Sequence, residues 1–325
     1  MAKAFHADIL DRTEVRRSSG RAVRLIGRLM GDDVVMAWAC FRRRKSYDLI
    51  FTDGEQVGIP LAALFRLVPS HRPRHLMIVH ILSVPKKTVP FRLLRLGARI
   101  DRMFVYATAQ ERFVVNRLHY PRDQVVLTPF MVDTKFFAPQ AARADGPPLI
   151  ASAGLEFRDY PTLIDAIRDL DVRVVLAAAS PWSRRRDSSS DRELPDNVEV
   201  RRLGLADLRE LYASADLIVV PVVETDFQAG ITTILEAMAM GKPLICTRTT
   251  GQTDTVVDGE TGVYVPPGDV ASLCAAIEAL LDDPERAARL GTAARRWAEQ
   301  HGDIETYARR LAGVVDAELA KGRHG

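Results

Sequence analysis

The hydrophobic and polar positions of this chain follow one repeated order, in which a short apolar run precedes a longer amphipathic stretch. The apolar runs predict buried strands, and the stretches between them have the spacing of helices. Strands are expected at 48–52, 75–79, 103–106, 125–128, 149–152, 172–178, 198–201, 217–220, 244–247 and 262–265. Helices are expected at 59–67, 109–118, 160–170, 206–214, 232–240 and 270–281. Strands that alternate with helices predict an α/β fold with parallel sheets.

This repeated order is interrupted once, by the small, polar and Pro-rich stretch 138–148, which is typical of a linker. A chain of 325 residues is long for one domain. Residues 1–140 hold 24 Lys and Arg against 12 Asp and Glu, whereas residues 141–325 hold 21 against 30. We therefore predict an N-terminal domain at 1–140 and a C-terminal domain at 141–325.

The positive charge of the first half predicts an anionic partner, such as a membrane surface, a nucleic acid or an acidic substrate. No nucleic-acid-binding module is recognisable, so we expect no nucleic-acid partner. The stretch 86–102 combines basic residues with Leu and Phe, which is typical of a solvated amphipathic helix or of a segment that contacts an anionic bilayer. Because the chain has no apolar run of transmembrane length and no signal-like start, we expect a cytoplasmic protein, peripheral on the inner face of the membrane.

Several chemistries lack their sequence motifs. The three cysteines stand singly in apolar surroundings, and no Cys or His spacing suggests zinc. The chain contains neither GxGxxG nor GxxxxGK[ST], which argues against a dinucleotide oxidoreductase and a P-loop enzyme. GxSxG is also absent, which argues against a hydrolase of that type.

The stretch 223–244 has the strongest chemical signal. A polar loop leads from a buried strand into a helix that we expect to begin at Thr232. The N-terminus of such a helix, at the carboxyl end of a sheet, offers free N–H groups and positive dipole charge to a phosphate. Glu236 lies about one turn inside, within reach of a ribose or sugar hydroxyl.

Residues that follow other strands of the second half suit the same ligand. Gly154 and Gly204 come after the strands at 149–152 and 198–201, where glycine permits close approach of a ligand to the backbone. Arg158 supplies a guanidinium for a diphosphate. Because ligands bind beyond the carboxyl ends of parallel strands, these residues together predict a site for a nucleotide diphosphate.

The segment 228–243, QAGITTILEAMAMGKP, resembles the donor-site motif of the GT-B-fold retaining glycosyltransferases of family 4. The segments GQTDTVVDGETGVYVPPGD at 251–269, LYASADLIVVP at 211–221, VDTKFF at 132–137 and RDYPTLI at 158–164 are also similar to that family. The resemblance implies two Rossmann-like domains that face each other across a cleft, with C-terminal helices that return to the first domain. The usual first strand is not found before Asp48, so we expect an N-terminal domain that is shortened at its start.

The resemblance also implies a function. It suggests a hexosyltransferase that moves a hexose from a UDP- or GDP-linked sugar to an acceptor glycan, lipid-linked glycan or small molecule, with retention of configuration. Glu236 matches the second acid of the family's E-x7-E motif, which typically binds the ribose, and Gln228 matches the first, which typically faces the donor sugar. His80 ends a strand where related enzymes often keep a histidine near the transferred sugar. No metal and no other cofactor are implied.

The diphosphate contacts are implied in the same way. Ile231 and Thr232 match positions whose backbone N–H groups meet the diphosphate, and Gly230 precedes them. Arg158 matches the family's diphosphate-binding lysine, whereas Leu155 stands where the family usually has a further basic residue.

Two alternatives stay open. One is a nucleotide-sugar epimerase on the same fold, which would need no acceptor. The other is a nucleotide-sugar-binding protein without turnover, because Gln228 can hydrogen-bond a sugar hydroxyl but cannot accept a proton.

Overall fold

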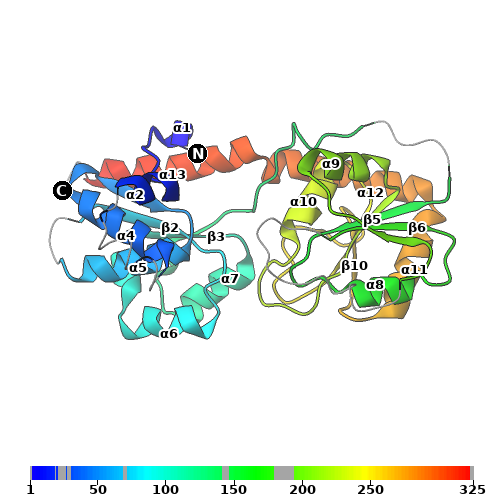
Figure 1. Cartoon of the computed structure of the whole chain (residues 1–325), viewed down its shortest axis with the longest axis horizontal. Helices are drawn as coiled ribbons and strands as arrows, with labels where there is room; N and C mark the ends of the chain where they lie inside the picture. The colour runs from blue at the N-terminus through cyan, green and yellow to red at the C-terminus, as the bar shows by residue number, and fades with distance from the viewer. Residues whose placement is uncertain are drawn as a thin grey trace. The chain divides into compact units, whose positions relative to one another are not determined.

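The computed structural model of the chain describes residues 2–18, 20, 27, 31–68, 72–140, 146–178 and 194–322. The chain divides into two compact units (Figure 1). Unit 1 comprises Met1–Thr128 and Ala308–Gly325, and unit 2 comprises Pro129–Tyr307. Part of the predicted linker, residues 141–145, lies outside the described residues.

Unit 1 contains a parallel sheet in which the strands lie side by side in the order of the sequence. Its strands are β1 (Leu49–Thr52), β2 (Arg74–Ile78), β3 (Arg102–Val105) and β4 (Val125–Leu127). Its helices are α1 (Ala2–Phe5), α2 (Arg12–Ser18), α4 (Asp32–Arg43), α5 (Glu55–Arg66), α6 (Pro85–Leu93) and α7 (Thr108–Arg112), with most of α13 (Ile304–Gly322). Short 3-10 turns follow α4 and α6, and a π-helical turn, Phe113–Arg117, follows α7.

Unit 2 contains a larger parallel sheet with the strand order β10-β9-β8-β5-β6-β7. Its strands are β5 (Leu149–Ala153), β6 (Arg173–Ala177), β7 (Val198–Val200), β8 (Leu217–Val220), β9 (Leu244–Thr247) and β10 (Val263–Val265). Its helices are α8 (Tyr160–Ala166), α9 (Leu205–Ser214), α10 (Ile231–Ala239), α11 (Val270–Leu281) and α12 (Pro284–Trp297), and α12 continues into a π-helical turn, Ala298–Gly302.

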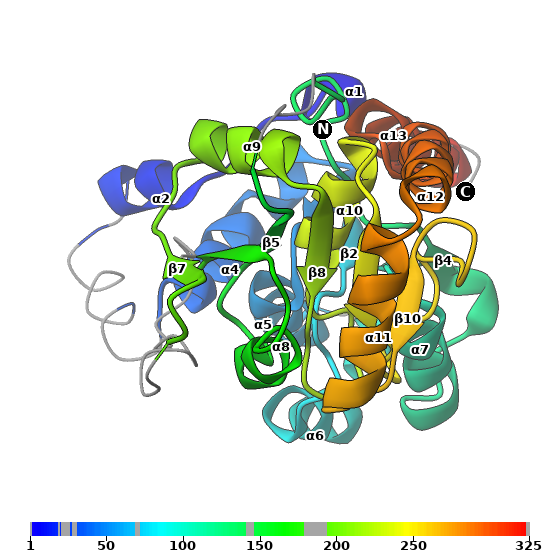
Figure 2. The ribbon, with the colours of Figure 1, turned by 90° about the vertical axis from the view of Figure 1, so that its right-hand side faces the viewer.

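Alternate residues of these strands bury two cores on opposite faces of the second sheet. Ala151 of β5 packs in a cluster with residues of α9, α10 and α12. Its neighbour Ile150 packs in another cluster with residues of α8 and α11. Helices α8 and α11 lie side by side on their face (Figure 1, Figure 2). This alternation follows from the two-residue period of a strand. The predicted parallel sheet is confirmed, and helices cover both of its faces.

All ten predicted strands are present, and each begins and ends within one residue of the prediction. The helices differ more. Helix α5 begins at Glu55 rather than at residue 59, directly after Gly54, whose φ is 120°. The amphipathic stretch 86–102 is not one helix, because α6 ends at Leu93 and Arg95 has a left-handed φ of 46°. A left-handed residue cannot continue a right-handed helix.

The boundary between the units differs from the predicted division at 140/141. The segment after Thr128 belongs to unit 2, because Phe137 is buried in the core beneath α10. Arg295 Nη1 also donates hydrogen bonds to the carbonyls of Thr134 and Phe137, at 3.0 and 2.9 Å. The segment from Ala308 onward belongs to unit 1, where buried Glu318 accepts a hydrogen bond from Arg102 at 2.8 Å.

Candidate functional site

The strand order of unit 2 creates a reversal point between β5 and β8. The chain runs outward from β5 through β6 to β7, and then returns to the other side of β5 as β8. In open parallel sheets, the loops beyond such adjacent carboxyl ends leave in opposite directions and form a crevice in which ligands bind. Here the two ends are Ala153 and Val220, and the residues that follow them form the candidate site.

Arg158 ties the two sides of this reversal point together. Its Nε donates to the carbonyl of Ala153 at 2.7 Å, and its Nη2 donates to the Thr233 hydroxyl at 3.1 Å. The Thr233 hydroxyl in turn donates to the carbonyl of Ala153 at 3.3 Å. Burial lowers the pKa of Arg158, opposed by the nearby Tyr160, Tyr212 and Glu236. An arginine stays protonated in proteins all the same, so a positive charge is fixed between β5 and α10.

Two glycines make room for this guanidinium. Gly154 has φ 100°, and a Cβ on it would lie 2.4 Å from Arg158 Nη2. Gly230 has φ 80°, and a Cβ on it would lie 2.8 Å from Val220 Cγ1 and 3.4 Å from Arg158 Nη1. Both positions therefore require glycine for the backbone conformation and for space. The structure brings Gly154, Gly230 and Arg158 together, as a common role in donor binding would require.

The N-terminus of α10 begins beside Arg158. Gly230 is its N-cap, and no side chain caps it. The first-turn N–H groups of Ile231 and Thr232 lie at this end, and Thr232 is exposed. Uncapped first-turn N–H groups and the helix dipole favour an anion. The backbone contacts of Ile231 and Thr232 with a diphosphate stay a prediction.

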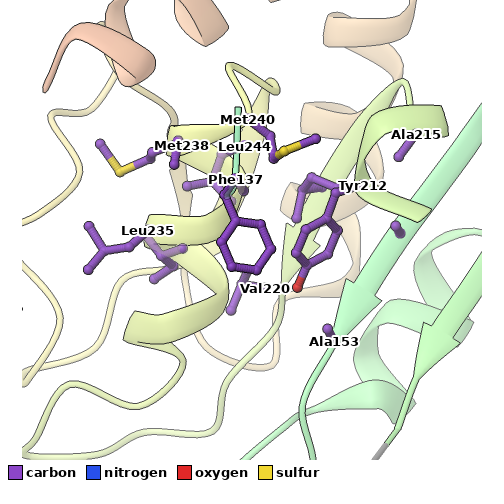
Figure 3. Close-up of a cluster of buried hydrophobic side chains, with 14 of the residues drawn as sticks. Phe137, Ala153, Tyr212, Ala215, Val220, Leu235, Met238, Met240 and Leu244 are labelled. Atoms are coloured by element: carbon purple, nitrogen blue, oxygen red, sulfur yellow. The ribbon is translucent and has the colours of Figure 1, made fainter. Parts of the chain in front are cut away.

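Glu236 lies farther along α10 with its carboxylate mostly buried. Tyr212 of α9 donates a hydrogen bond to Glu236 Oε2 at 3.1 Å. Burial raises the pKa of Glu236 to about 7, and the Tyr212 hydrogen bond and the charge of Arg158 act in the opposite direction. Figure 3 shows the Tyr212 hydroxyl pointing toward Ala153 and Val220, at the ends of β5 and β8. Tyr212 was missed from the sequence, because its apolar neighbours at helical spacing indicate only a core residue.

Gln228 lies in the loop that leads into α10. Its Nε2 donates a long hydrogen bond of 3.4 Å to the Thr255 hydroxyl. Its Oε1 is buried and has no hydrogen-bond partner among the described residues. The loop is held from the β9 side by two bonds, Gly251 N–H to the Thr225 carbonyl at 2.9 Å and Thr250 N–H to Glu224 at 2.8 Å. A buried acceptor that lacks a partner costs free energy, so Gln228 Oε1 is suited to a ligand hydroxyl.

Gly204 differs from the other glycines of the predicted site. It is the N-cap of α9, is exposed and has an ordinary φ of −73°. It follows β7, the edge strand, which β6 separates from β5. The described contacts do not connect Gly204 with Arg158 or α10, and its role in donor binding stays a prediction.

His80 lies in unit 1, at the carboxyl end of β2. Its Nε2 lies 3.7 Å from Asp53 Oδ1, and its ring centroid lies 5.6 Å from that of Tyr106. Its backbone is held from both sides: the N–H donates to Glu55 Oε2 at 2.8 Å, and the carbonyl accepts from Gln110 Nε2 at 2.6 Å. The histidine is therefore fixed by its main chain and has a half-exposed ring.

Glu55 is the residue of unit 1 whose importance the sequence did not reveal. Its side chain is fully buried at the start of α5 and forms an ion pair with Lys87 at 2.5 Å. It also accepts hydrogen bonds from the N–H groups of His80 and Ile81. One acidic residue after a glycine, as in Asp53–Gly54–Glu55, carries no specific signal in the sequence.

Two other features are absent from the described residues. No group of three or more His, Cys, Asp and Glu side chains there is arranged to hold a metal ion. In the same residues, no helix combines the length and the apolar character needed to cross a bilayer.

Part of the sequence of unit 2 matches a family model. Residues 156–283 match the model described as glycosyl transferases group 1. The MMP alpha-(1->4)-mannosyltransferase of Mycolicibacterium hassiacum is 27% identical over 237 residues, which cover 70% of this chain and 56% of that protein. The GDP-mannose-dependent alpha-(1-6)-phosphatidylinositol monomannoside mannosyltransferase of Mycolicibacterium smegmatis is 31% identical over 214 residues, 59% of this chain and 55% of that protein. The chain thus spans just over half the length of these relatives.

Solved structures share the fold over most of the chain. The sucrose-phosphate synthase of Thermosynechococcus elongatus has a TM-score of 0.74 at 22% identity and covers 92% of this chain and 80% of its own. Anabaena HepE in complex with UDP-glucose has a TM-score of 0.72 at 17% identity, covering 90% and 84%. The predicted GT-B fold is therefore confirmed. Residues 156–283 thus match the model of glycosyl transferases group 1, within a chain that has the α/β GT-B fold.

Proposed function

We propose that this chain transfers a hexose from a nucleotide diphosphate sugar to an acceptor hydroxyl, with retention of configuration at the anomeric carbon. The observation that supports this most directly is the meeting of Arg158, the uncapped N-terminus of α10 and Glu236 at one reversal point. A nucleotide sugar presents a diphosphate beside a ribose with two hydroxyls. The proposed site offers a cation and N–H donors to the first and a carboxylate to the second.

The residues suggest how the reaction would proceed. The bond between the anomeric carbon and the diphosphate oxygen breaks, and Arg158 and the α10 N-terminus stabilise the charge that develops on the leaving group. The acceptor oxygen bonds to the anomeric carbon on the face that the diphosphate leaves, and its proton passes to a diphosphate oxygen. In this scheme Gln228 needs only to hydrogen-bond the sugar, and the retained configuration follows from attack on the same face. His80 is proposed to contact the transferred sugar.

The donor and acceptor classes are also proposals. One relative is named as GDP-mannose-dependent, and a structural neighbour was solved with UDP-glucose. We accordingly propose a UDP- or GDP-linked hexose as donor. A relative named for a phosphatidylinositol mannoside and another named D-inositol 3-phosphate glycosyltransferase support a lipid-linked glycan, a glycan or a small polyol as acceptor.

Calorimetric titration of the full chain with UDP-, GDP- and ADP-sugars tests the donor site. One of these donors should bind, and Glu236→Ala should weaken its binding about tenfold or more, because a charged hydrogen bond contributes about 1.5–3 kcal/mol. Glu260→Ala, which removes an exposed carboxylate of the same unit, is the matched control. If neither variant changes the affinity, or if no nucleotide sugar binds, the placement of the donor is wrong.

A second function, donor binding without turnover, is supported by the glutamine at 228. Product analysis with candidate acceptors distinguishes the two functions. A glycosylated product whose anomeric configuration equals that of the donor supports transfer, whereas binding without any product supports the second function. A new nucleotide sugar formed without an acceptor would indicate an epimerase. Gln228→Ala should lower kcat more than donor affinity if the amide contacts the reacting sugar.

A further inference from the structure

A long stretch of unit 1 carries basic residues without any acidic residue. Between Gln56 and Ile100 the sequence contains eight Lys and Arg and no Asp or Glu. Some of these cations are bound within the unit: Arg72 and Arg74 pair with Asp101, and Lys87 pairs with Glu55. The positive charge that is not neutralised in this way is concentrated on α6 and the turn after it.

The cations of α6 and this turn face solvent. Lys86, Arg92 and Arg95 are exposed, and none of them forms an ion pair with another described residue. Arg95 extends the patch because its left-handed backbone ends the helix and turns the chain. Like charges that lie close together raise the local positive potential, which attracts an anionic surface.

The same element exposes apolar side chains that the core does not use. Leu93 is 77% exposed, Val89 52% and Leu94 44%. Val89 and Leu93 are four residues apart, so they share one face of α6. Phe91 is buried in the cluster that also contains Leu82 and Leu96, and it anchors the helix to unit 1. The exposed leucines therefore do not hold α6 in place, and Figure 1 shows α6 at the outer edge of its unit.

We infer that the surface formed by Pro85–Arg95 docks on an anionic lipid bilayer. Val89, Leu93 and Leu94 would enter the interface between headgroups and acyl chains, while Lys86, Arg92 and Arg95 would contact lipid phosphates. The combination favours a bilayer over a nucleic acid, because a nucleic acid gives exposed leucines nothing to enter and prefers aromatic side chains on which bases stack. A few cations and three apolar side chains would give weak, reversible attachment that salt reverses.

This surface lies close to the proposed acceptor side. Helix α6 begins five residues after His80, and Glu55 binds both the His80 N–H and Lys87 of α6. Docking would thus bring the carboxyl end of β2 toward a bilayer, where a lipid-linked acceptor would be located. The docking itself does not depend on the donor site, so it can fail or succeed separately from the proposed reaction.

Co-sedimentation of the full chain with vesicles tests the inference. Vesicles of phosphatidylcholine with phosphatidylglycerol should bind the protein, and vesicles of phosphatidylcholine alone should bind it much less. Leu93→Gln should lower the partition coefficient about tenfold, and Arg92→Gln and Arg95→Gln about fivefold each. Raising the salt concentration should weaken the binding of the wild-type protein.

Leu205→Gln and Arg286→Gln are the matched controls, because they make the same changes at exposed positions of unit 2. Thermal melting of each variant should match that of the wild type, since all of these side chains are exposed. Equal partition into neutral and anionic vesicles, no partition into either, or equal losses for Leu93→Gln and Leu205→Gln would overturn the inference. If light scattering shows that the wild type is a dimer and that Leu93→Gln is a monomer, the surface binds a second copy of the chain instead.

Discussion

The two parallel sheets of this protein differ in how they position the loops and the buried charged side chains at the carboxyl ends of their strands. The sheet of unit 2 reverses direction between β5 and β8, whereas the described strands of unit 1 follow one another without a reversal. In unit 2 the topology itself separates two loops, and Arg158 spans the space between them. In unit 1 a buried carboxylate, Glu55, holds the loop after β2 in place.

The two buried charges show what each unit is built to do. Arg158 donates to carbonyl and hydroxyl oxygens and keeps its positive charge beside the N-terminus of α10. The charge of Glu55, in contrast, is compensated by Lys87 and two backbone N–H groups. A compensated charge fixes a backbone, whereas a cation beside a helix N-terminus attracts an anion. This difference agrees with our proposal that unit 2 binds the anionic donor, whereas Glu55 fixes the backbone of His80 in unit 1.

The largest loss of stability is expected when the buried Glu55 carboxylate of unit 1 loses its ion pair with Lys87. Lys87→Met leaves the fully buried Glu55 carboxylate without its cation and should lower the free energy of unfolding by about 3 kcal/mol. Chemical denaturation followed by circular dichroism measures this loss. Lys135→Met is the control, since its pair with Glu305 is exposed on both sides and should contribute at most about 0.5 kcal/mol. Equal losses for the two variants would remove the role assigned to Glu55.

Glu236→Gln should stabilise the free protein at high pH. The native pKa of about 7 lies above the ordinary value of 4.5, so the native state holds this proton more tightly than the unfolded state does. The wild type therefore loses stability as the pH rises from about 4.5 to 7, by on the order of 3 kcal/mol. The variant, which has no titrating carboxyl there, should be more stable by about this amount at pH 8 and by little at pH 4.5.

Denaturation of wild type and Glu236→Gln at several pH values checks this prediction, with Glu260→Gln as the control for an exposed carboxylate. Donor affinity should change in the opposite sense. If the carboxylate accepts ribose hydroxyls, wild-type affinity for a nucleotide sugar should rise through about pH 7, while that of the variant stays flat. A nucleotide sugar is the right probe, because its diphosphate is esterified at both ends and does not titrate there. A pH-independent stability difference would contradict the assignment.

Gly154→Ala tests whether the reversal point of unit 2 needs its glycine. The φ of 100° and the 2.4 Å approach of a Cβ to Arg158 Nη2 should cost about 2 kcal/mol of stability. Displacement of the guanidinium should also weaken nucleotide-sugar binding about tenfold. Thermal melting and calorimetry give the two values, and unchanged donor affinity would mean that Arg158 does not face the diphosphate.

Gly204→Ala should have the smallest effect on stability and on donor affinity. Its φ is −73°, and an added Cβ would come no closer than 3.7 Å to a neighbouring atom, Asp207 Oδ2. The change in unfolding free energy should stay within about 0.5 kcal/mol, measured by the same denaturation. A donor affinity that falls as far as in Gly154→Ala would extend the site to the edge strand β7 and would weaken the contrast with the reversal point.

The sequence predicted the fold and its strands more accurately than the ends of the helices and the boundary between the two units. Strands were located within one residue, because buried apolar runs between polar turns leave little freedom. Helix ends were less certain, since they depend on backbone conformations such as those of Gly54 and Arg95. The boundary between the units lies after Thr128 and not at the predicted 140/141, because Val132 and Phe137 pack into the core of unit 2. Local composition cannot reveal such a long-range contact.

The site shows the same division. The site around Arg158, Gly230 and Glu236 was predicted from the order of these residue types along the chain, because glycine, a cation and a helix N-terminus together favour a phosphate. Tyr212 and Glu55 were not, since their importance comes from partners 24 and 25 residues away in the sequence.

Local chemistry thus determined that this chain forms alternating strands and helices, and it predicts a site for a nucleotide diphosphate. Only the tertiary structure decided which strands became neighbours, and with them where β5 and β8 end together. It also decided which charges are buried. Burial removes water from Glu236 and Glu55 alike, but the partners that replace the water come from other elements. They therefore leave one carboxyl with a pKa near 7 and the other in an ion pair.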